Sequence, residues 1–164
     1  MIYNINKYIP TGPILWYSTR ENGKSNSQAV YYDTIPKNII SGTTIRSLYS
    51  DPDSPLGFVP LGNNYNITYT CCRTPTNNLN SAITFSSCFE TFNINTPFGS
   101  VSGSTVYYDK GSGIDTSVDK NIYNITGGTG NFRESVIAII TYDNSGEKFG
   151  YPFSRKIEFF RLKN

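Results

Sequence analysis

The chain has 164 residues, a net charge of +2 and no histidine. Histidine is the commonest metal ligand and the usual general base at neutral pH. Its absence excludes Ser-His-Asp and Cys-His catalysis and argues against a zinc site, so no metal or cofactor is predicted. So small a charge does not favour nucleic-acid binding, and no apolar stretch approaches the ~20 residues of a membrane span.

Residue composition favours strands over helices. Aromatic residues make up 15% of the chain, with 13 Tyr and 10 Phe, whereas Ala and Glu are scarce. This bias is typical of short β-strands joined by Asn, Gly, Ser and Pro turns. The chain opens on strand-like alternation without a signal-peptide pattern, so we expect a cytoplasmic protein. Its Asn, Ile, Tyr and Lys content also suggests an AT-rich genome such as that of a large DNA virus, which makes a virion-associated protein the other expectation.

Runs of β-branched and aromatic residues predict the strands in chain order. The first is predicted over residues 1–6, and the second over 14–17 after a turn at Pro10–Pro13. Residues 20–55 are polar and turn-rich, with short strands around 29–33 and 44–48. Further strands are predicted near 58–59, 67–73, 83–92, 99–108, 122–126, 135–142 and 155–162. This spacing predicts a single all-β domain, an antiparallel sandwich or barrel.

A glycine-dense turn separates two of these runs. Gly127, Gly128 and Gly130 are expected to supply backbone conformations with positive φ. The run that follows, residues 135–142, is β-branched and short, so the glycines are predicted to join strand to strand. A phosphate-binding loop would instead need a helix N-terminus after the glycines.

The sequence predicts the redox state of the cysteines and the exposure of the C-terminal basic residues. Cys71, Cys72 and Cys88 are odd in number, and sequence neighbours do not readily form a disulfide, so reduced thiols are expected. The basic residues near the C-terminus are interpreted as solvent-facing charges that protect the edge of a terminal strand. They are Arg155, Lys156, Arg161 and Lys163.

Five motifs in order resemble the allene oxide cyclase and dirigent superfamily, and several are closest to the cyclases. They lie at residues 3–13, 57–63, 99–109, 125–132 and 151–162. The resemblance implies an eight-stranded antiparallel β-barrel that forms a homotrimer. Residues 21–54 then correspond to an insertion, through which a protein partner is expected to bind.

The resemblance also implies a pocket inside the barrel. Asn6, Pro13 and Asn63 match the residues that hold a water against the substrate's epoxide oxygen, and Cys71 or Cys72 lies near the pocket cysteine. Two groups differ from the cyclases. Asn4 stands in place of the acidic residue that steadies the developing cation, and Thr105 in place of a pocket tyrosine. Loss of one such electrostatic group typically costs about 3 kcal/mol of transition-state stabilisation.

These differences favour a non-enzymatic, structural or interaction role for the barrel. The alternative is a cyclase-like isomerase, or a carrier, that binds a lipid-like or aromatic molecule inside the barrel. The barrel interior distinguishes the two. A binding protein should keep an open apolar cavity with convergent polar groups such as Asn6 and Asn63, whereas a structural protein should fill it with side chains.

Overall fold

A computed structural model describes the backbone over residues 5–18, 24–32, 37–55, 57–75, 84–110, 120–143 and 154–164. Side chains are described within these ranges over residues 6–18, 41–55, 57–70, 88–106, 122–143 and 154–164.

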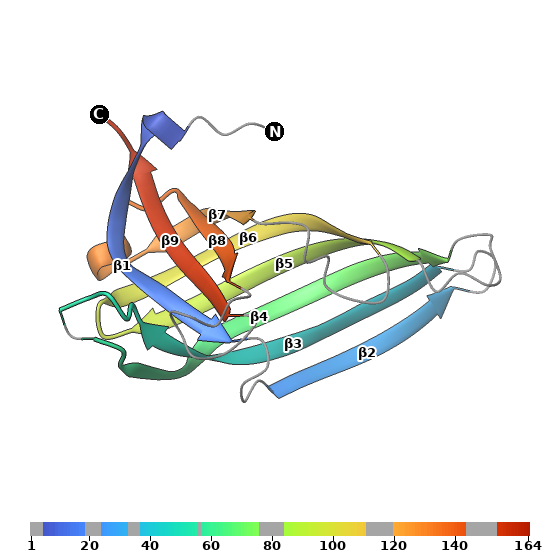
Figure 1. Cartoon of the computed structure of the whole chain (residues 1–164). Helices are drawn as coiled ribbons and strands as arrows, with labels where there is room; N and C mark the ends of the chain where they lie inside the picture. Colours follow the sequence, from blue (N-terminus) through green and yellow to red (C-terminus); the bar gives the residue numbers. More distant parts are fainter. Residues whose placement is uncertain are drawn as a thin grey trace.

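Nearly all of the described chain lies in nine antiparallel strands (Figure 1). They are β1 (Tyr8–Ser18), β2 (Lys24–Tyr32), β3 (Lys37–Ser50), β4 (Pro60–Pro75), β5 (Thr84–Thr96), β6 (Gly99–Lys110), β7 (Lys120–Gly128), β8 (Ile137–Asp143) and β9 (Ser154–Leu162). Two short 3₁₀ helices, η1 (Ile5–Lys7) and η2 (Gly130–Phe132), complete the elements. Among the described residues no helix is long and apolar enough to cross a membrane.

Eight of the strands form a closed ring. Their order is β1-β9-β8-β7-β6-β5-β4-β3, and pairing of β1 with β3 at Leu15↔Ser50 and Trp16↔Tyr49 closes it. The predicted eight-stranded antiparallel β-barrel is therefore confirmed. The ninth strand, β2, pairs with β3 and lies outside the ring. Residues 21–54 thus supply one strand of the ring, β3, as well as the additional strand β2.

Strand length gives the molecule its asymmetric shape. Strands β3–β6 have 12 to 16 residues, whereas β7–β9 have 7 to 9. The long strands therefore continue beyond the closed ring, and with β2 they form an elongated sheet to one side of it (Figure 1). We call this part the extension.

The N-terminal predictions need correction. Residues 5–7 form η1 and not a strand, while residues 1–4 lie outside the described part of the chain. The predicted turn at Pro10–Pro13 lies inside β1, at a register shift between Thr11 and Leu15 where Gly12 has φ 68°. Such an irregularity tolerates proline within a strand, because the ladder hydrogen bonds are already interrupted there. Residues 58–59 precede β4 instead of forming a strand.

The glycine-dense turn joins strand to strand, as predicted, through η2 between β7 and β8. Positive φ is confirmed for Gly130, at 57°, but not for Gly127 or Gly128. Gly128 is required for a different reason. A Cβ there would lie 2.2 Å from the carbonyl oxygen of Phe132, so only glycine allows the turn to fold back so closely.

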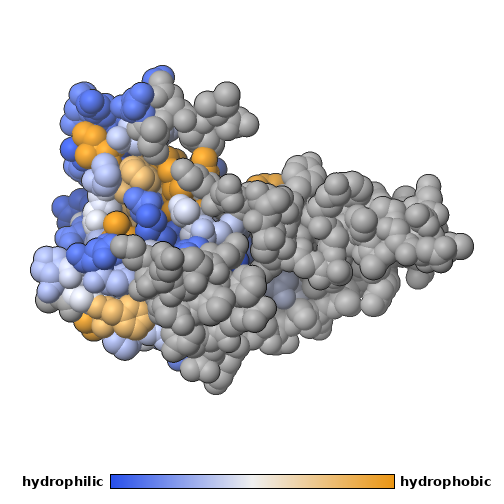
Figure 2. Space-filling model, viewed as in Figure 1, coloured by the Kyte–Doolittle hydropathy of each residue, from blue (hydrophilic) through white to orange (hydrophobic). Residues whose placement is uncertain are grey.

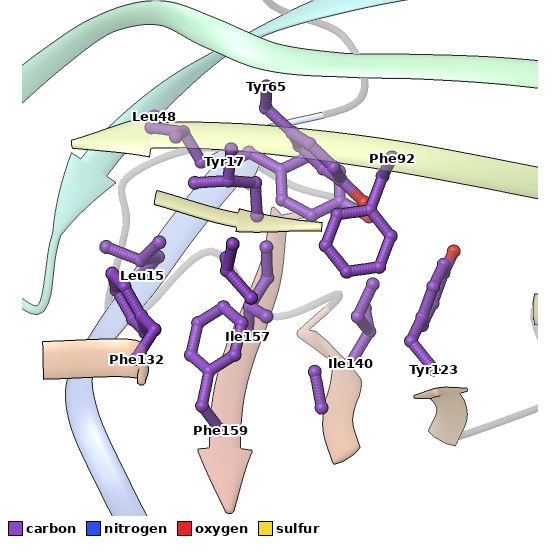
Figure 3. Packing of buried hydrophobic residues seen from close by; sticks show 13 residues of the cluster. Leu15, Tyr17, Leu48, Tyr65, Phe92, Tyr123, Phe132, Ile140, Ile157 and Phe159 are labelled. Carbon is purple, nitrogen blue, oxygen red and sulfur yellow. The ribbon is translucent and has the colours of Figure 1, made fainter. Parts of the chain in front are cut away.

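The ring encloses one continuous apolar cluster (Figure 3). At the end away from the extension, Phe132 packs edge-on against Phe159 with ring centroids 4.7 Å apart. Further along, the rings of Tyr17, Tyr65, Phe92 and Tyr123 follow one another at centroid distances of 5.0, 6.0 and 5.2 Å. The aliphatic members are Leu15, Leu48, Ile94, Val101, Ala138, Ile140 and Ile157.

Gly103 provides the room that this packing needs. A Cβ at this buried position would lie 2.8 Å from the Phe92 ring and 2.3 Å from the carbonyl oxygen of Asn124. We therefore expect Gly103→Ala to lower the free energy of unfolding by about 1–3 kcal/mol in urea titrations. Gly127→Ala is the matched control, because nothing lies within 4 Å of its Cβ position and its φ is not positive. Equal stability of the two variants would show that the Phe92 site is not tightly packed.

Candidate functional site

The structure separates the residues that sequence reasoning assigned to one pocket. Asn6, in η1, and Asn63, in β4, are both exposed, and the Asn63 amide oxygen accepts a hydrogen bond from the Ser47 hydroxyl. Pro13 is half-buried in β1, whereas Thr105 in β6 is buried. Asn4 lies outside the described residues. Asn6 and Asn63 therefore do not converge on the barrel interior.

Cys71 is described through its backbone in β4, where it lies directly opposite Cys88 of β5. Cys88 is buried and disulfide-bonded, so the expectation of reduced thiols is wrong. That expectation rested on the odd number of cysteines and on the adjacency of Cys71 and Cys72. Strand pairing brings together cysteines that are distant in sequence, and the register makes Cys71 the expected partner of Cys88.

Thr105 has a structural hydrogen bond. The regular register of β6 with β7 ends at Ser104↔Asn124, and one residue later the Thr105 hydroxyl donates to the carbonyl oxygen of Ile122 at 2.9 Å. The side chain thus continues the link between the two strands. Its hydroxyl is engaged by the backbone, and its Cα partner on β5 is Glu90.

A chain of polar groups, three buried tyrosine hydroxyls and the half-buried carboxylate of Glu90, crosses the barrel beside Thr105. The Tyr123 hydroxyl donates to Oε2 of Glu90 at 2.8 Å, and the Tyr65 hydroxyl is hydrogen-bonded to both Tyr17 and Tyr123. We call these four residues, from β1, β4, β5 and β7, the tyrosine layer. Figure 3 shows the rings of Tyr65 and Tyr123 on either side of Phe92. Alternation along each strand turns these side chains inward together with the apolar residues two positions away.

The tyrosines of this layer are neutral. Burial raises the pKa of Tyr17, Tyr65 and Tyr123, because the low-dielectric interior disfavours the phenolate, and the nearby Glu90 carboxylate raises each further. None of the three is therefore a base or a nucleophile near neutral pH. They can donate and accept hydrogen bonds as neutral hydroxyls.

These pKa shifts predict alkaline unfolding. The folded-state pKa of each tyrosine lies above its unfolded value near 10, so the layer stabilises the fold fully below about pH 10 and loses this contribution as pH rises. Ultraviolet absorbance should show that Tyr17, Tyr65 and Tyr123 ionise only as circular dichroism reports unfolding. Tyr65→Phe should remove one of these late ionisations. Ionisation of all tyrosines near pH 10 in a folded protein would contradict this prediction.

Arg155 departs from its predicted place on the surface. β9 lies between β1 and β8 and is not an edge strand, and Arg155 at its start is only 2% exposed. The other basic residues of this segment do face solvent. Lys156 lies 3.2 Å from Glu158, Arg161 lies 3.7 Å from Glu134, and Lys163 is exposed.

Two tyrosines flank Arg155 in the sheet. It is the Cα partner of Tyr17 on β1 and of Tyr142 on β8, and its guanidinium carbon lies 3.9 Å from the centroid of the Tyr142 ring. This distance is typical of a cation–π interaction. We call Tyr17, Arg155 and Tyr142 the arginine row. Because Tyr17 belongs to both groups, the arginine row adjoins the tyrosine layer.

Comparison with known proteins found no matching family model, no matching curated protein and no matching solved structure. In the part of the chain that the structure describes, no three His, Cys, Asp or Glu side chains gather to hold a metal ion. The site is therefore characterised by its own groups: neutral tyrosine hydroxyls, one carboxylate that accepts from Tyr123, and one buried guanidinium.

Proposed function

We propose that this protein is a non-enzymatic, trimeric β-barrel with a structural or interaction role, derived from an allene oxide cyclase-like ancestor. The observation that supports this role best is the packing of the ring interior. Aromatic and aliphatic side chains from β1, β3–β9 and η2 occupy the space where a cyclase would fold its substrate. An eight-stranded barrel has an interior just wide enough for side chains to fill or to hold one small ligand, so packing by its own side chains disfavours an interior ligand.

The polar groups support the same proposal. A cyclase-like pocket needs groups that hold the epoxide oxygen and stabilise a developing cation. Asn6 and Asn63 are exposed, the Thr105 hydroxyl is bonded to the backbone, and Asn4 carries no charge. The proposed role is therefore carried by the outside of the barrel. A virion is the favoured location over the reducing cytosol, since Cys88 is disulfide-bonded.

The outer surface favours partner binding through a strand edge. In the coloured part of Figure 2, hydrophobic residues form separate groups among hydrophilic ones. By contrast, β2 pairs with β3 alone within the described chain, so its other edge can accept a further strand. This edge belongs to residues 21–54, the region proposed to bind a protein partner.

Native mass spectrometry tests the oligomeric part of the proposal. The purified protein is expected at three times the mass of one 18.3 kDa chain. A monomer at micromolar concentration would contradict the proposed trimer.

A second candidate function is a carrier that binds a small molecule at one end of the barrel. The arginine row favours it, because a buried charge is seldom retained without a compensating partner.

A further inference from the structure

We propose that the arginine row is a binding site for a small organic carboxylate, held by the Arg155 guanidinium between Tyr17 and Tyr142. The proposal rests on the carrier candidate and is independent of the scaffold role. The three residues lie side by side on β1, β9 and β8, in a single row of Cα partners. Tyr17 is near the end of β1, Tyr142 near the end of β8 and Arg155 at the start of β9.

The guanidinium has unused donors. Arginine carries five N–H donors, and among the described residues only the carbonyl oxygen of Ser154 accepts one, from Nη1 at 3.0 Å. The remaining contact is with the face of the Tyr142 ring. The described ion pairs of β9 involve Lys156 and Arg161 and not Arg155. A guanidinium that is 2% exposed thus lacks a carboxylate partner in the described part of the chain.

Surrounding charges also favour an anion. Burial lowers the pKa of Arg155, the neighbouring tyrosines oppose that effect, and the charge of Arg46 lowers the pKa further. Two arginines therefore influence the same region of the interior. The carboxylate of the tyrosine layer, Glu90, already accepts a hydrogen bond from Tyr123. A carboxylate bound at Arg155 would supply the negative partner that its guanidinium lacks among the described residues.

Geometry selects the carboxylate class. The planar guanidinium fork matches the two oxygens of a carboxylate in parallel hydrogen bonds, and a tyrosine hydroxyl can donate a third. The flanking rings of Tyr17 and Tyr142 favour a flat or aromatic group behind the carboxylate.

Isothermal titration of the whole protein with benzoate and with hexanoate tests the proposal. Benzyl alcohol and hexanol are the neutral controls. The wild type should bind benzoate, hexanoate or both at ligand concentrations up to about 10 mM. It should not bind either alcohol in the same range. Arg155→Met should weaken binding at least tenfold, because it removes the charge and the fork but keeps a similar volume. Arg161→Met, which changes an arginine on the surface, should leave binding unchanged.

Stability measurements distinguish a ligand site from a structural arginine. Without ligand, Arg155→Met should unfold at the same or a higher temperature, because an uncompensated buried charge is removed. Should this variant fail to fold, Arg155→Lys keeps the charge without the fork and should bind more weakly than the wild type. Failure of the wild type to bind either carboxylate, or equal binding by Arg155→Met, would overturn the proposal. Neither result bears on whether the protein is a trimer.

Discussion

Phe132→Ala is expected to lower the free energy of unfolding by about 3–5 kcal/mol, measured by urea or guanidinium titration. Phe132 has no exposed surface and packs edge-on against Phe159. Its ring also fills the space above Gly12, where a Cβ would lie 2.9 Å from two ring carbons. Truncation would leave a cavity between β1, β9 and η2, which these closely paired backbones cannot close.

Phe89→Ala is the matched control, since it removes the same atoms from a side chain that is 50% exposed on β5. We expect it to change the free energy of unfolding by less than about 1 kcal/mol. Similar losses in the two variants would mean that Phe132 does not occupy the core at the end of the barrel.

Cys88→Ala is expected to have the second-largest effect, a loss of about 3 kcal/mol under oxidising conditions. The disulfide of Cys88 restricts the unfolded chain, and with Cys71 as partner it would close the loop between β4 and β5. Titration with and without a thiol reductant measures the effect. The reductant should destabilise the wild type by a similar amount and leave the Cys88→Ala variant unchanged.

Thiol counting provides the independent check of this disulfide. The denatured, unreduced wild type should expose one free thiol, because one disulfide engages two of the three cysteines. Peptide mapping should find Cys88 linked to Cys71, its partner in the register. Three free thiols in freshly purified protein would contradict the structure at this point.

Most ring strands could be predicted from local sequence. The runs that form β4–β9 alternate or are rich in β-branched and aromatic residues, and turn residues separate them. Strand ends and irregularities could not be predicted in the same way. Pro10 and Pro13 predict a turn, yet β1 continues through them, because its pairing with β9 resumes after the register shift between Thr11 and Leu15. The pairing with a strand distant in sequence decides where β1 ends, and a short stretch of sequence does not contain that information.

The candidate site was harder to predict than the fold. On β9, Arg155 lies on the inner face together with Ile157 and Phe159, which follow it two and four residues later. On β5, Phe92 and Ile94 follow Glu90 at the same two-residue spacing. This two-residue spacing was the sequence pattern that could have placed Arg155 and Glu90 on the inner face. It was obscured because Phe160, on the other face of β9, is also buried. The hydrogen bonds that join Tyr17, Tyr65 and Tyr123 depend on ring closure and could not be read from sequence.

Chiral analysis of the ring product formed from an allene oxide in the presence of the protein tests the central claim most directly. The proposed non-enzymatic role rests on the apolar side chains packed inside the ring, which would compete with a substrate for the space that enantioselective closure needs. We expect a racemic product that forms at the spontaneous rate. An enantiomeric excess that increases with protein concentration would contradict the proposed non-enzymatic role.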